Sequence, residues 1–351
     1  MAANRLFAAT VLAVALPGSA LAAEPPREQF AHATVTYDFV TNAAGEKLRT
    51  FVTRPKARRG KVPAVFFVGW LSCDSVEYAA GETDGFGAFM RRIIDQSGYA
   101  TVRMDKPGVG ESEGRCNKAD FDAELTGYQA AFEAMSKYDF IDTDKVFVVG
   151  ISNGGGVSPL VTHGKPVAGY VAVGSWGRTW YEHMLEEERV RLARAGNMKP
   201  GEINDALRSL ALFYSSYLMF GKTPGAALKA HPEWRLREQP ALLEDITDDG
   251  QYGRPAMFYQ QLQSLNLGRV WQAVTAPVLV IRGSDDTIMS RNDAQAIADN
   301  VNAAHPGQAR YAEVRGMTHL MMVNDKFDAP LVPKVLRWMR VQLHQAAREP
   351  Q

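Results

Sequence analysis

The sequence lacks an excess of charge of either sign, because its 351 residues include 39 basic and 39 acidic side chains. A chain without net charge produces no global field that would recruit nucleic acid or an anionic membrane surface. It also lacks a basic run interleaved with aromatic residues, so nucleic-acid binding is not expected. With 46% hydrophobic residues, its composition is typical of a globular protein with a large core.

Cysteine is nearly absent, since only Cys73 and Cys116 occur. Neither a Cys-x-x-Cys nor a His-x-x-x-His spacing is present, so no metal site is expected. In an oxidising compartment two cysteines can form one disulfide. Both residues fall in loops expected after neighbouring strands, on one side of the predicted sheet, where a bridge would stiffen the rim of a site. Two free, buried thiols are the alternative.

The sequence also lacks an apolar run long enough to span a bilayer. Its longest candidate is near the N-terminus, where Arg5 precedes an apolar stretch from Leu6 to Leu16. Pro17 interrupts the stretch, and the small-residue site at residues 20–22 follows. This layout predicts a secretory signal peptide over residues 1–22, cleaved after Ala22, rather than a membrane anchor. We therefore expect an exported protein, periplasmic or secreted, with no membrane anchor after cleavage.

Apolar stretches of strand length alternate with helical patterns along most of the chain. Strands are expected at residues 34–39, 47–53, 63–68, 99–104, 146–149, 167–173, 277–281 and 309–314. Helices are expected at residues 86–96, 121–138, 292–301 and 332–345. This alternation predicts an α/β fold with a doubly wound, mostly parallel sheet.

The alternation stops between the two parts of the predicted sheet. Residues 176–272 have a helical, aromatic-rich pattern without a convincing strand. We therefore expect a helical cap at 176–272, inserted between core segments at 33–175 and 273–346. No internal repeat is found.

The segment Val146 to Gly156 is the most informative stretch of the chain. An apolar strand ends in Gly150-Ile151-Ser152-Asn153-Gly154, the pattern of a nucleophile elbow that holds a serine at a sharp strand-to-helix turn. Side chains at Gly150 and Gly154 would collide across so tight a turn. The alternative is a glycine-rich turn with an incidental serine.

A serine hydroxyl becomes a good nucleophile only when a base accepts its proton and a carboxylate orients that base. Two later strands end in loops that carry such groups. One loop contains Asp285 and Asp286, and the next contains His319. The order serine, aspartate, histidine is the order used by this type of fold. We expect Asp286 rather than Asp285 to be the acid, because it stands third after Gly283.

These motifs together resemble the α/β-hydrolase superfamily, over residues 34–345, and more closely its serine aminopeptidase and dienelactone hydrolase-like esterase branch. The loop at residues 105–114, Asp-Lys-Pro-Gly-Val-Gly-Glu-Ser-Glu-Gly, resembles the corresponding loop of that branch. The resemblance implies Ser152 as nucleophile, His319 as general base and then acid, and an oxyanion hole formed by the backbone amides of Asn153 and Trp70.

Two positions depart from the pattern of the superfamily. Members commonly have His-Gly where this chain has Val68-Gly69, which leaves open whether Trp70 or Leu71 supplies the amide. A histidine often precedes the serine, where this chain has Ile151. Neither departure removes a catalytic group.

The predicted cap and the loop after the strand at 63–68 contain candidate residues for contact with a substrate. Leu71, Trp176, Trp180 and Tyr181 are candidates for an apolar substrate pocket, although ordinary helix packing is expected to explain most aromatic residues of the cap. The run at residues 186–189, Glu-Glu-Glu-Arg, is expected to be a solvated helix face. A substrate with a free amine would need a carboxylate near the site, for which Glu182 is a candidate.

The sequence therefore predicts an exported serine hydrolase that cleaves a carboxylic ester through an acyl-enzyme. The alternatives are a serine aminopeptidase or amidase, an acyltransferase with the same triad, and a non-catalytic binding protein. No cofactor is expected, because Gly108-Val109-Gly110 lacks the third glycine of a dinucleotide fingerprint and Gly221-Lys222-Thr223 lacks the first glycine of a phosphate loop. The expected partner is a small-molecule ester or a short peptide, and the sequence does not indicate an oligomeric state.

Overall fold

The computed structural model describes residues 28–79, 81, 85–235 and 245–346. The predicted signal peptide, residues 1–22, lies outside the described residues. Within the described ranges, no helix combines the length and the apolar character needed to cross a membrane.

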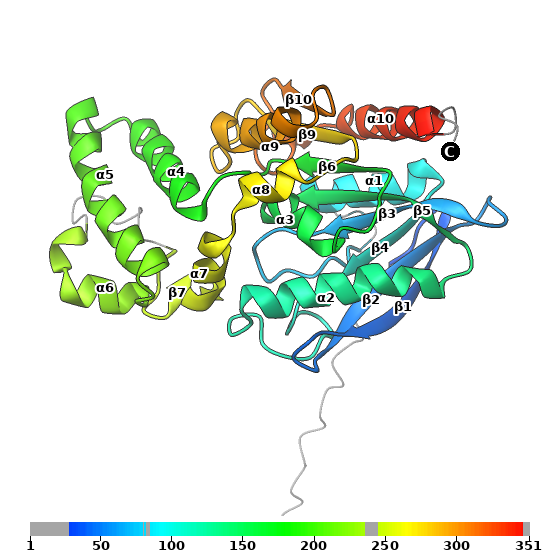
Figure 1. The fold of residues 1–351 in the computed structure, drawn as a ribbon, viewed down its shortest axis with the longest axis horizontal. Coiled ribbons are helices and arrows are strands. Elements are labelled where there is room, and N and C mark those ends of the chain that lie inside the picture. Colours follow the sequence, from blue (N-terminus) through cyan, green and yellow to red (C-terminus); the bar gives the residue numbers. More distant parts are fainter. Residues whose placement is uncertain (1–27, 80, 82–84, 236–244, 347–351) are drawn as a thin grey trace, which may run out of the picture.

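A mixed sheet forms the centre of the protein (Figure 1). In the described part of the chain it has eight strands, in the order β1 (Ala33–Thr41), β2 (Lys47–Pro55), β4 (Ala100–Met104), β3 (Val62–Val68), β5 (Ile141–Ile151), β6 (Gly169–Val173), β9 (Val278–Gly283) and β10 (Ala309–Val314). The hairpin β1–β2 pairs antiparallel with β4, and all the following neighbours are parallel. The predicted fold class, a mostly parallel α/β sheet, is confirmed.

Helices cover both faces of the sheet, which explains why its central strands are apolar throughout. Val65 and Phe67 of β3 face a core built with α1 (Gly85–Ser97) and α10 (Leu331–Ala346). Ala64 and Phe66 face the opposite core. The helices of that second core are α2 (Phe121–Ala134), α3 (Asn153–Val161), α8 (Leu267–Gln272) and α9 (Arg291–Ala304).

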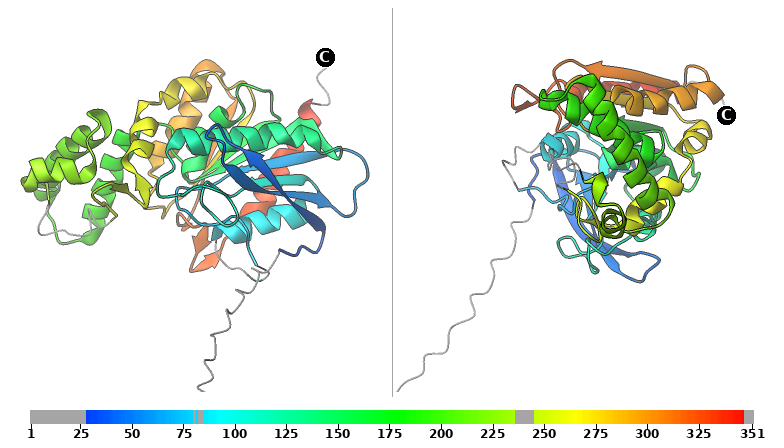
Figure 2. Two further views of the ribbon diagram at one scale, coloured as in Figure 1. Left: turned by 90° about the horizontal axis from the view of Figure 1, so that it is seen from below. Right: turned by 90° about the vertical axis from the view of Figure 1, so that its left-hand side faces the viewer.

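A helical segment is inserted between β6 and β9, and Figures 1 and 2 show it projecting beyond one end of the sheet. We call this segment the cap. Its elements are α4 (Trp180–Ala195), α5 (Pro200–Tyr214), a π-helical turn (Ser215–Met219), α6 (Pro224–Ala230), a 3-10 turn (Pro232–Trp234) and α7 (Ala256–Ser264). The expectation of a cap without strands is wrong in one detail, because β7 (Gly250–Gln251) pairs antiparallel with β8 (Arg254–Pro255). Two-residue strands are too short to leave a periodic pattern.

Parallel strands end at one edge of a sheet, so the loops after β3, β4, β5, β6, β9 and β10 meet at the same edge. Ser152 follows β5, and Asp286 and His319 follow β9 and β10. A second small hairpin, β11 (Met322–Val323) with β12 (Lys326–Phe327), comes directly after the His319 loop. The topology therefore gathers the candidate residues on one edge.

Candidate active site

Ser152 occupies a strained turn between β5 and α3. Its φ of 55° and ψ of −125° lie outside the regions that residues with a side chain prefer. The surrounding structure holds this conformation: the Ser152 amide donates to the carbonyl of Val173 at 2.9 Å, and the Ser175 hydroxyl donates to the Ser152 carbonyl at 2.9 Å. A Cβ at Gly150 would lie 2.4 Å from the Cα of Gly155. The turn thus requires glycine and presents the Ser152 side chain at its apex.

His319 links the other two candidate groups. Its Nε2 lies 3.0 Å from Ser152 Oγ, and its Nδ1 lies 2.9 Å from Asp286 Oδ2. The other carboxylate oxygen of Asp286 accepts hydrogen bonds from the amides of Ile288 and Met289 at 3.0 and 2.9 Å. The structure thus brings together Ser152, His319 and Asp286, in the arrangement that lets an imidazole take a hydroxyl proton while a carboxylate fixes its tautomer.

Asp285 lies elsewhere. Its side chain is exposed and accepts a hydrogen bond from the Ser284 hydroxyl at 2.9 Å. The same hydroxyl accepts from the amide of Gly316 at 2.7 Å, so it ties the Asp286 loop to the His319 loop. At Gly283 the two loops are in backbone contact, because a Cβ there would overlap the carbonyl oxygen of Met317. These contacts fix the position of Asp286 relative to His319.

Helix α1 supports the His319 loop from the other side. The ring of Phe86 meets the imidazole edge-on, with centroids 5.9 Å apart. Gly85 packs so closely on the carbonyl of Leu320 that no side chain fits there. The amide of Thr318 donates to the carbonyl of Met322 at 2.9 Å, so the hairpin β11–β12 also restrains the loop. Its two-residue strands leave no periodic pattern, so the sequence does not indicate this hairpin.

The two candidate oxyanion donors come from loops in direct contact. A Cβ at Gly154 would lie 2.2 Å from the carbonyl oxygen of Gly69, so the start of α3 and the end of β3 pack backbone against backbone. Asn153 directly precedes Gly154, and Trp70 directly follows Gly69. Within the described residues, neither amide donates a hydrogen bond to another residue. The Asn153 side chain accepts a hydrogen bond from Trp176 Nε1 at 3.2 Å, which steadies the elbow.

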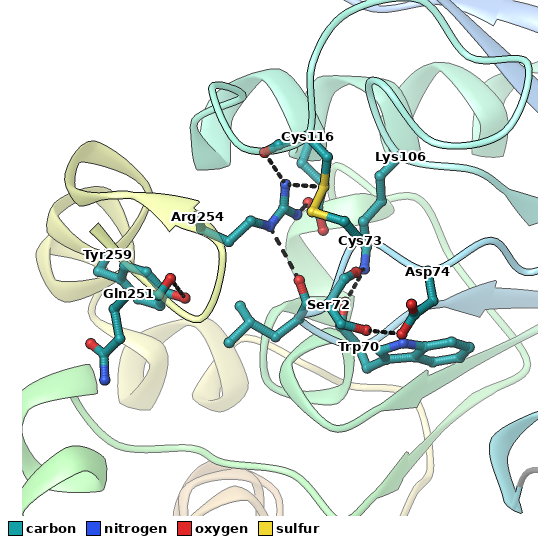
Figure 3. Close-up of a disulfide and its surroundings, with 11 residues drawn as sticks. Trp70, Ser72, Cys73, Asp74, Lys106, Cys116, Gln251, Arg254 and Tyr259 are labelled. Carbon is teal, nitrogen blue, oxygen red and sulfur yellow. Dashed lines mark hydrogen bonds and ion pairs between the residues drawn. A yellow bond between two sulfur atoms is a disulfide. The ribbon is translucent and has the colours of Figure 1, made fainter. Parts of the chain in front are cut away.

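Cys73 and Cys116 form a disulfide, as the sequence predicted. The bridge joins the loop after β3 to the loop after β4, with Cα atoms 5.9 Å apart and a sequence separation of 43. It lies beside the segment that carries Trp70 (Figure 3). The disulfide therefore stiffens one side of the candidate oxyanion hole.

The four candidate pocket residues differ in position. Trp176 and Trp180 are fully buried and pack edge to face, with ring centroids 5.0 Å apart. Tyr181 and Leu71 are half-buried. The Tyr181 hydroxyl donates to the carbonyl of Ala211 at 3.3 Å, and the Leu71 side chain packs against the core. Trp176 contacts the turn at Ser152 through its hydrogen bond to the Asn153 side chain. A substrate-lining role for the four residues remains a prediction.

The expectation of a solvated face at residues 186–189 is wrong for two of its glutamates. Glu187 and Glu188 are buried, because α4 packs there against other cap segments. The Tyr214 hydroxyl donates to Glu188 Oε1 at 2.8 Å, and the Tyr252 hydroxyl donates to Glu187. Burial raises the pKa of Glu188 to about 7. These partners lie far away in the sequence, so the local pattern could not reveal the burial.

Glu187 also has two basic neighbours in the cap: His183 Nε2 lies 3.8 Å from its Oε2, and Arg191 Nε lies 3.9 Å from its Oε1. Burial raises the pKa of its carboxyl, while the charges of His183, Arg191 and His319 act in the opposite direction. Glu182, the carboxylate considered from the sequence, instead closes the N-terminus of α4: its Oε2 accepts hydrogen bonds from the amide and the hydroxyl of Thr179. The spacing Thr-x-x-Glu is the signature of this capping box, so the sequence contained the signal.

No cluster of three or more His, Cys, Asp or Glu side chains able to hold a metal ion occurs in the described ranges. The geometry at Ser152, His319 and Asp286 needs none, because the arrangement supplies a nucleophile, a base and an orienting carboxylate from the chain itself.

A protein-family model and several solved structures resemble the chain. The family model described as "Serine aminopeptidase, S33" matches residues 82–326. Among curated proteins, no relative matches the chain. Similar solved structures include DcsB in complex with its substrate analogue, at 16% identity and a TM-score of 0.56, covering 89% of this chain and 99% of that one.

Two further structures are similar over nearly the whole chain. Est1E from Butyrivibrio proteoclasticus, solved with bound ferulic acid, has 18% identity and a TM-score of 0.55, covering 89% of this chain and 100% of its own. The proline iminopeptidase of Mycobacterium smegmatis has 17% identity and a TM-score of 0.54, with 89% and 100% coverage. At such identities these similarities establish a shared fold.

Proposed function

The chain belongs to the serine aminopeptidase S33 family of α/β-hydrolases, and we propose that it is a serine hydrolase that cleaves carboxylic esters. The observation that supports this proposal most strongly is the pair of contacts made by His319, 3.0 Å to Ser152 Oγ and 2.9 Å to Asp286 Oδ2. Both lie within the hydrogen-bonding reach required of a nucleophile, its base and the orienting acid.

In the first half of the proposed reaction, Ser152 Oγ attacks the ester carbonyl carbon while its proton moves to His319 Nε2. The resulting oxyanion accepts hydrogen bonds from the amides of Asn153 and Trp70. The carbon–oxygen bond to the leaving group then breaks, and His319 returns the proton to give the alcohol. Ser152 is left acylated. Asp286 keeps Nδ1 protonated and stabilises the imidazolium.

In the second half, water attacks the acyl carbon and gives its proton to His319. The second oxyanion collapses, the bond to Ser152 Oγ breaks, and the serine recovers the proton. The products are a carboxylic acid and the free enzyme. All proton transfers use groups of this chain, so the reaction needs no cofactor.

A second candidate function is hydrolysis of aminoacyl amides. One observation favours it: the family is described as serine aminopeptidases. Rates on p-nitrophenyl esters and aminoacyl p-nitroanilides compare the two functions directly. Ester turnover without anilide turnover supports the first, and the reverse supports the second.

We also propose that the protein is exported. The N-terminal sequence pattern and the Cys73–Cys116 disulfide support this, because disulfides persist in oxidising compartments. N-terminal sequencing of the protein made in a bacterial host tests it. A mature chain that begins at residue 23 and is found outside the cytoplasm supports export, whereas an intact N-terminus contradicts it.

A further inference from the structure

The segment after β3, residues 69–73, has an unusual set of hydrogen bonds, and we call it the oxyanion loop. Three consecutive carbonyls of this loop accept hydrogen bonds from the side chains of two buried basic residues (Figure 3). Lys106 Nζ donates to the carbonyls of Trp70 and Ser72. Arg254 Nε donates to the carbonyl between them, that of Leu71, at 3.1 Å. The loop is thus held from two sides by two different side chains.

Lys106 is the second residue after β4 and is only 2% exposed. Burial lowers the pKa of its amine well below the usual value, with Asp74 and Asp105 acting in the opposite direction. Its nitrogen also lies 5.8 Å from the centroid of the Trp70 ring. An amine buried at such a cost in solvation is stabilised here by its two carbonyl acceptors.

Arg254 reaches the oxyanion loop from the cap, where it is part of β8. Its Nη1 donates to the carbonyl of Cys116 at 3.0 Å, and its Nη2 pairs with the carboxylate of Glu124 in α2. The same guanidinium therefore connects the cap, α2, the disulfide and the oxyanion loop. Each of its three nitrogens thus donates to a group of the chain itself.

These bonds determine where the candidate oxyanion amide points. A peptide unit is planar, so a bond to its carbonyl or its N–H fixes the whole unit. The unit before that of Trp70 is held by the Gly69 amide, which donates to the Tyr128 hydroxyl at 3.1 Å. The unit after it is held by Lys106. The Trp70 N–H lies between two fixed units, and the Leu71 N–H belongs to the second.

We propose that Lys106 and Arg254 are positioning residues that hold the oxyanion loop so that its amides face the oxyanion formed at Ser152. The inference rests on the proposed serine hydrolase function. Neither side chain touches the reacting atoms. Loss of either one therefore weakens binding of the transition state, while binding of the ground-state ester is little affected.

The first test replaces Lys106 by methionine, which has a similar shape and no donor. In Lys106→Met we expect kcat on a p-nitrophenyl ester to fall about 10- to 100-fold, less than the loss of a whole oxyanion donor, with KM nearly unchanged. Affinity for phenylboronic acid, which forms a tetrahedral adduct on a nucleophilic serine, should fall by a similar factor. An unchanged kcat, or a loss confined to KM, overturns the proposal.

Lys56, an exposed lysine with a similar pair of acceptors, serves as a control away from the site. Its Nζ also donates to two carbonyls, those of Phe30 and Ala31 at 2.9 and 3.1 Å. It follows β2, which runs antiparallel to β4, so it lies at the opposite edge of the sheet from Ser152. Lys56→Met should keep the wild-type kcat and boronate affinity. Equal losses in both variants would indicate a general effect on stability and would contradict a role at the oxyanion loop.

A second readout does not depend on catalysis. Amide hydrogen exchange of residues 69–73 should become faster in Lys106→Met and in Arg254→Lys, while α3 stays protected as in the wild type. Arg254→Lys keeps a charge but cannot reproduce the three-way pairing of the guanidinium. A wild type without ester turnover would count against the proposed function, and the exchange rates would still test whether the two residues hold the loop. Unchanged exchange in both variants overturns the proposal.

Discussion

Asp286 Oδ2 lies 2.9 Å from His319 Nδ1, whereas the side chain of the neighbouring Asp285 is exposed and bonded to Ser284. Two adjacent carboxylates of the same loop thus have different surroundings. Asp286 is held by two backbone amides, so it presents a fixed acceptor to the imidazole.

This difference predicts unequal effects of two otherwise identical substitutions. Asp286→Asn should lower kcat by about 10⁴-fold, the size of effect known when a triad aspartate is replaced by asparagine and the tautomer of the histidine is wrong. Asp285→Asn should leave kcat close to that of the wild type. Steady-state kinetics on one ester, with circular dichroism to verify folding, measures both. Equal losses, or the reverse order, would contradict the assignment of the acid.

The disulfide should contribute to both stability and rate. The chain-entropy model gives about 4 kcal/mol for a loop of this length, and measured values are commonly lower. Cys73→Ser with Cys116→Ser should therefore lower the free energy of unfolding by about 2–4 kcal/mol in urea titrations. It should also lower kcat, because Cys73 ends the oxyanion loop. Reducing agent should reproduce the loss in the wild type and have no effect on the double variant. Full activity of the reduced wild type would refute the effect on rate.

Glu188 should make stability depend on pH. Its pKa is raised from 4.5 in the unfolded chain to about 7 in the folded protein, chiefly by burial. Between these values the folded protein binds the proton more tightly, so the free energy of unfolding falls as the pH rises. The loss is complete above about pH 7 and amounts to about 3 kcal/mol.

Glu188→Gln removes this titration while retaining an acceptor for the Tyr214 hydroxyl. The variant should gain stability relative to the wild type as the pH is raised from 5 to 8, an increase of about 2–3 kcal/mol by the same linkage. Urea titrations at both pH values measure it. A difference that is constant over this range, or that shrinks towards pH 8, would show that Glu188 is not held protonated by its burial.

The sheet could be predicted from the sequence, and so could the loops that carry the three candidate residues, because both rest on local signals. Each central strand is a continuous apolar run, and Ser152 stands between glycines that a sharp turn requires. The positions of Asp286 and His319 follow from one rule, that parallel strands end at the same edge. The disulfide could be predicted as well, since Cys73 and Cys116 follow neighbouring strands.

The remaining features depend on contacts between distant segments. Lys106 stands in the loop at residues 105–114, and only the fold places its amine against the carbonyls of Trp70 and Ser72. Arg254 lies 183 positions away from its acceptor at Leu71. Glu187 and Glu188 are buried by tyrosines from other segments of the cap. Periodicity detects which residues face inward in one element, but it carries no information on which partners meet them.

We propose that Ser152 is an activated nucleophile, and labelling by a fluorophosphonate probe tests this most directly. The probe phosphonylates a serine only when a neighbouring base accepts the hydroxyl proton and an oxyanion hole stabilises the charged intermediate. Mature wild-type protein should be labelled, with the label mapped to Ser152 by mass spectrometry, and folded Ser152→Ala should not. A folded wild type that remains unlabelled, or a Ser152→Ala variant labelled as fast as the wild type, would contradict the account.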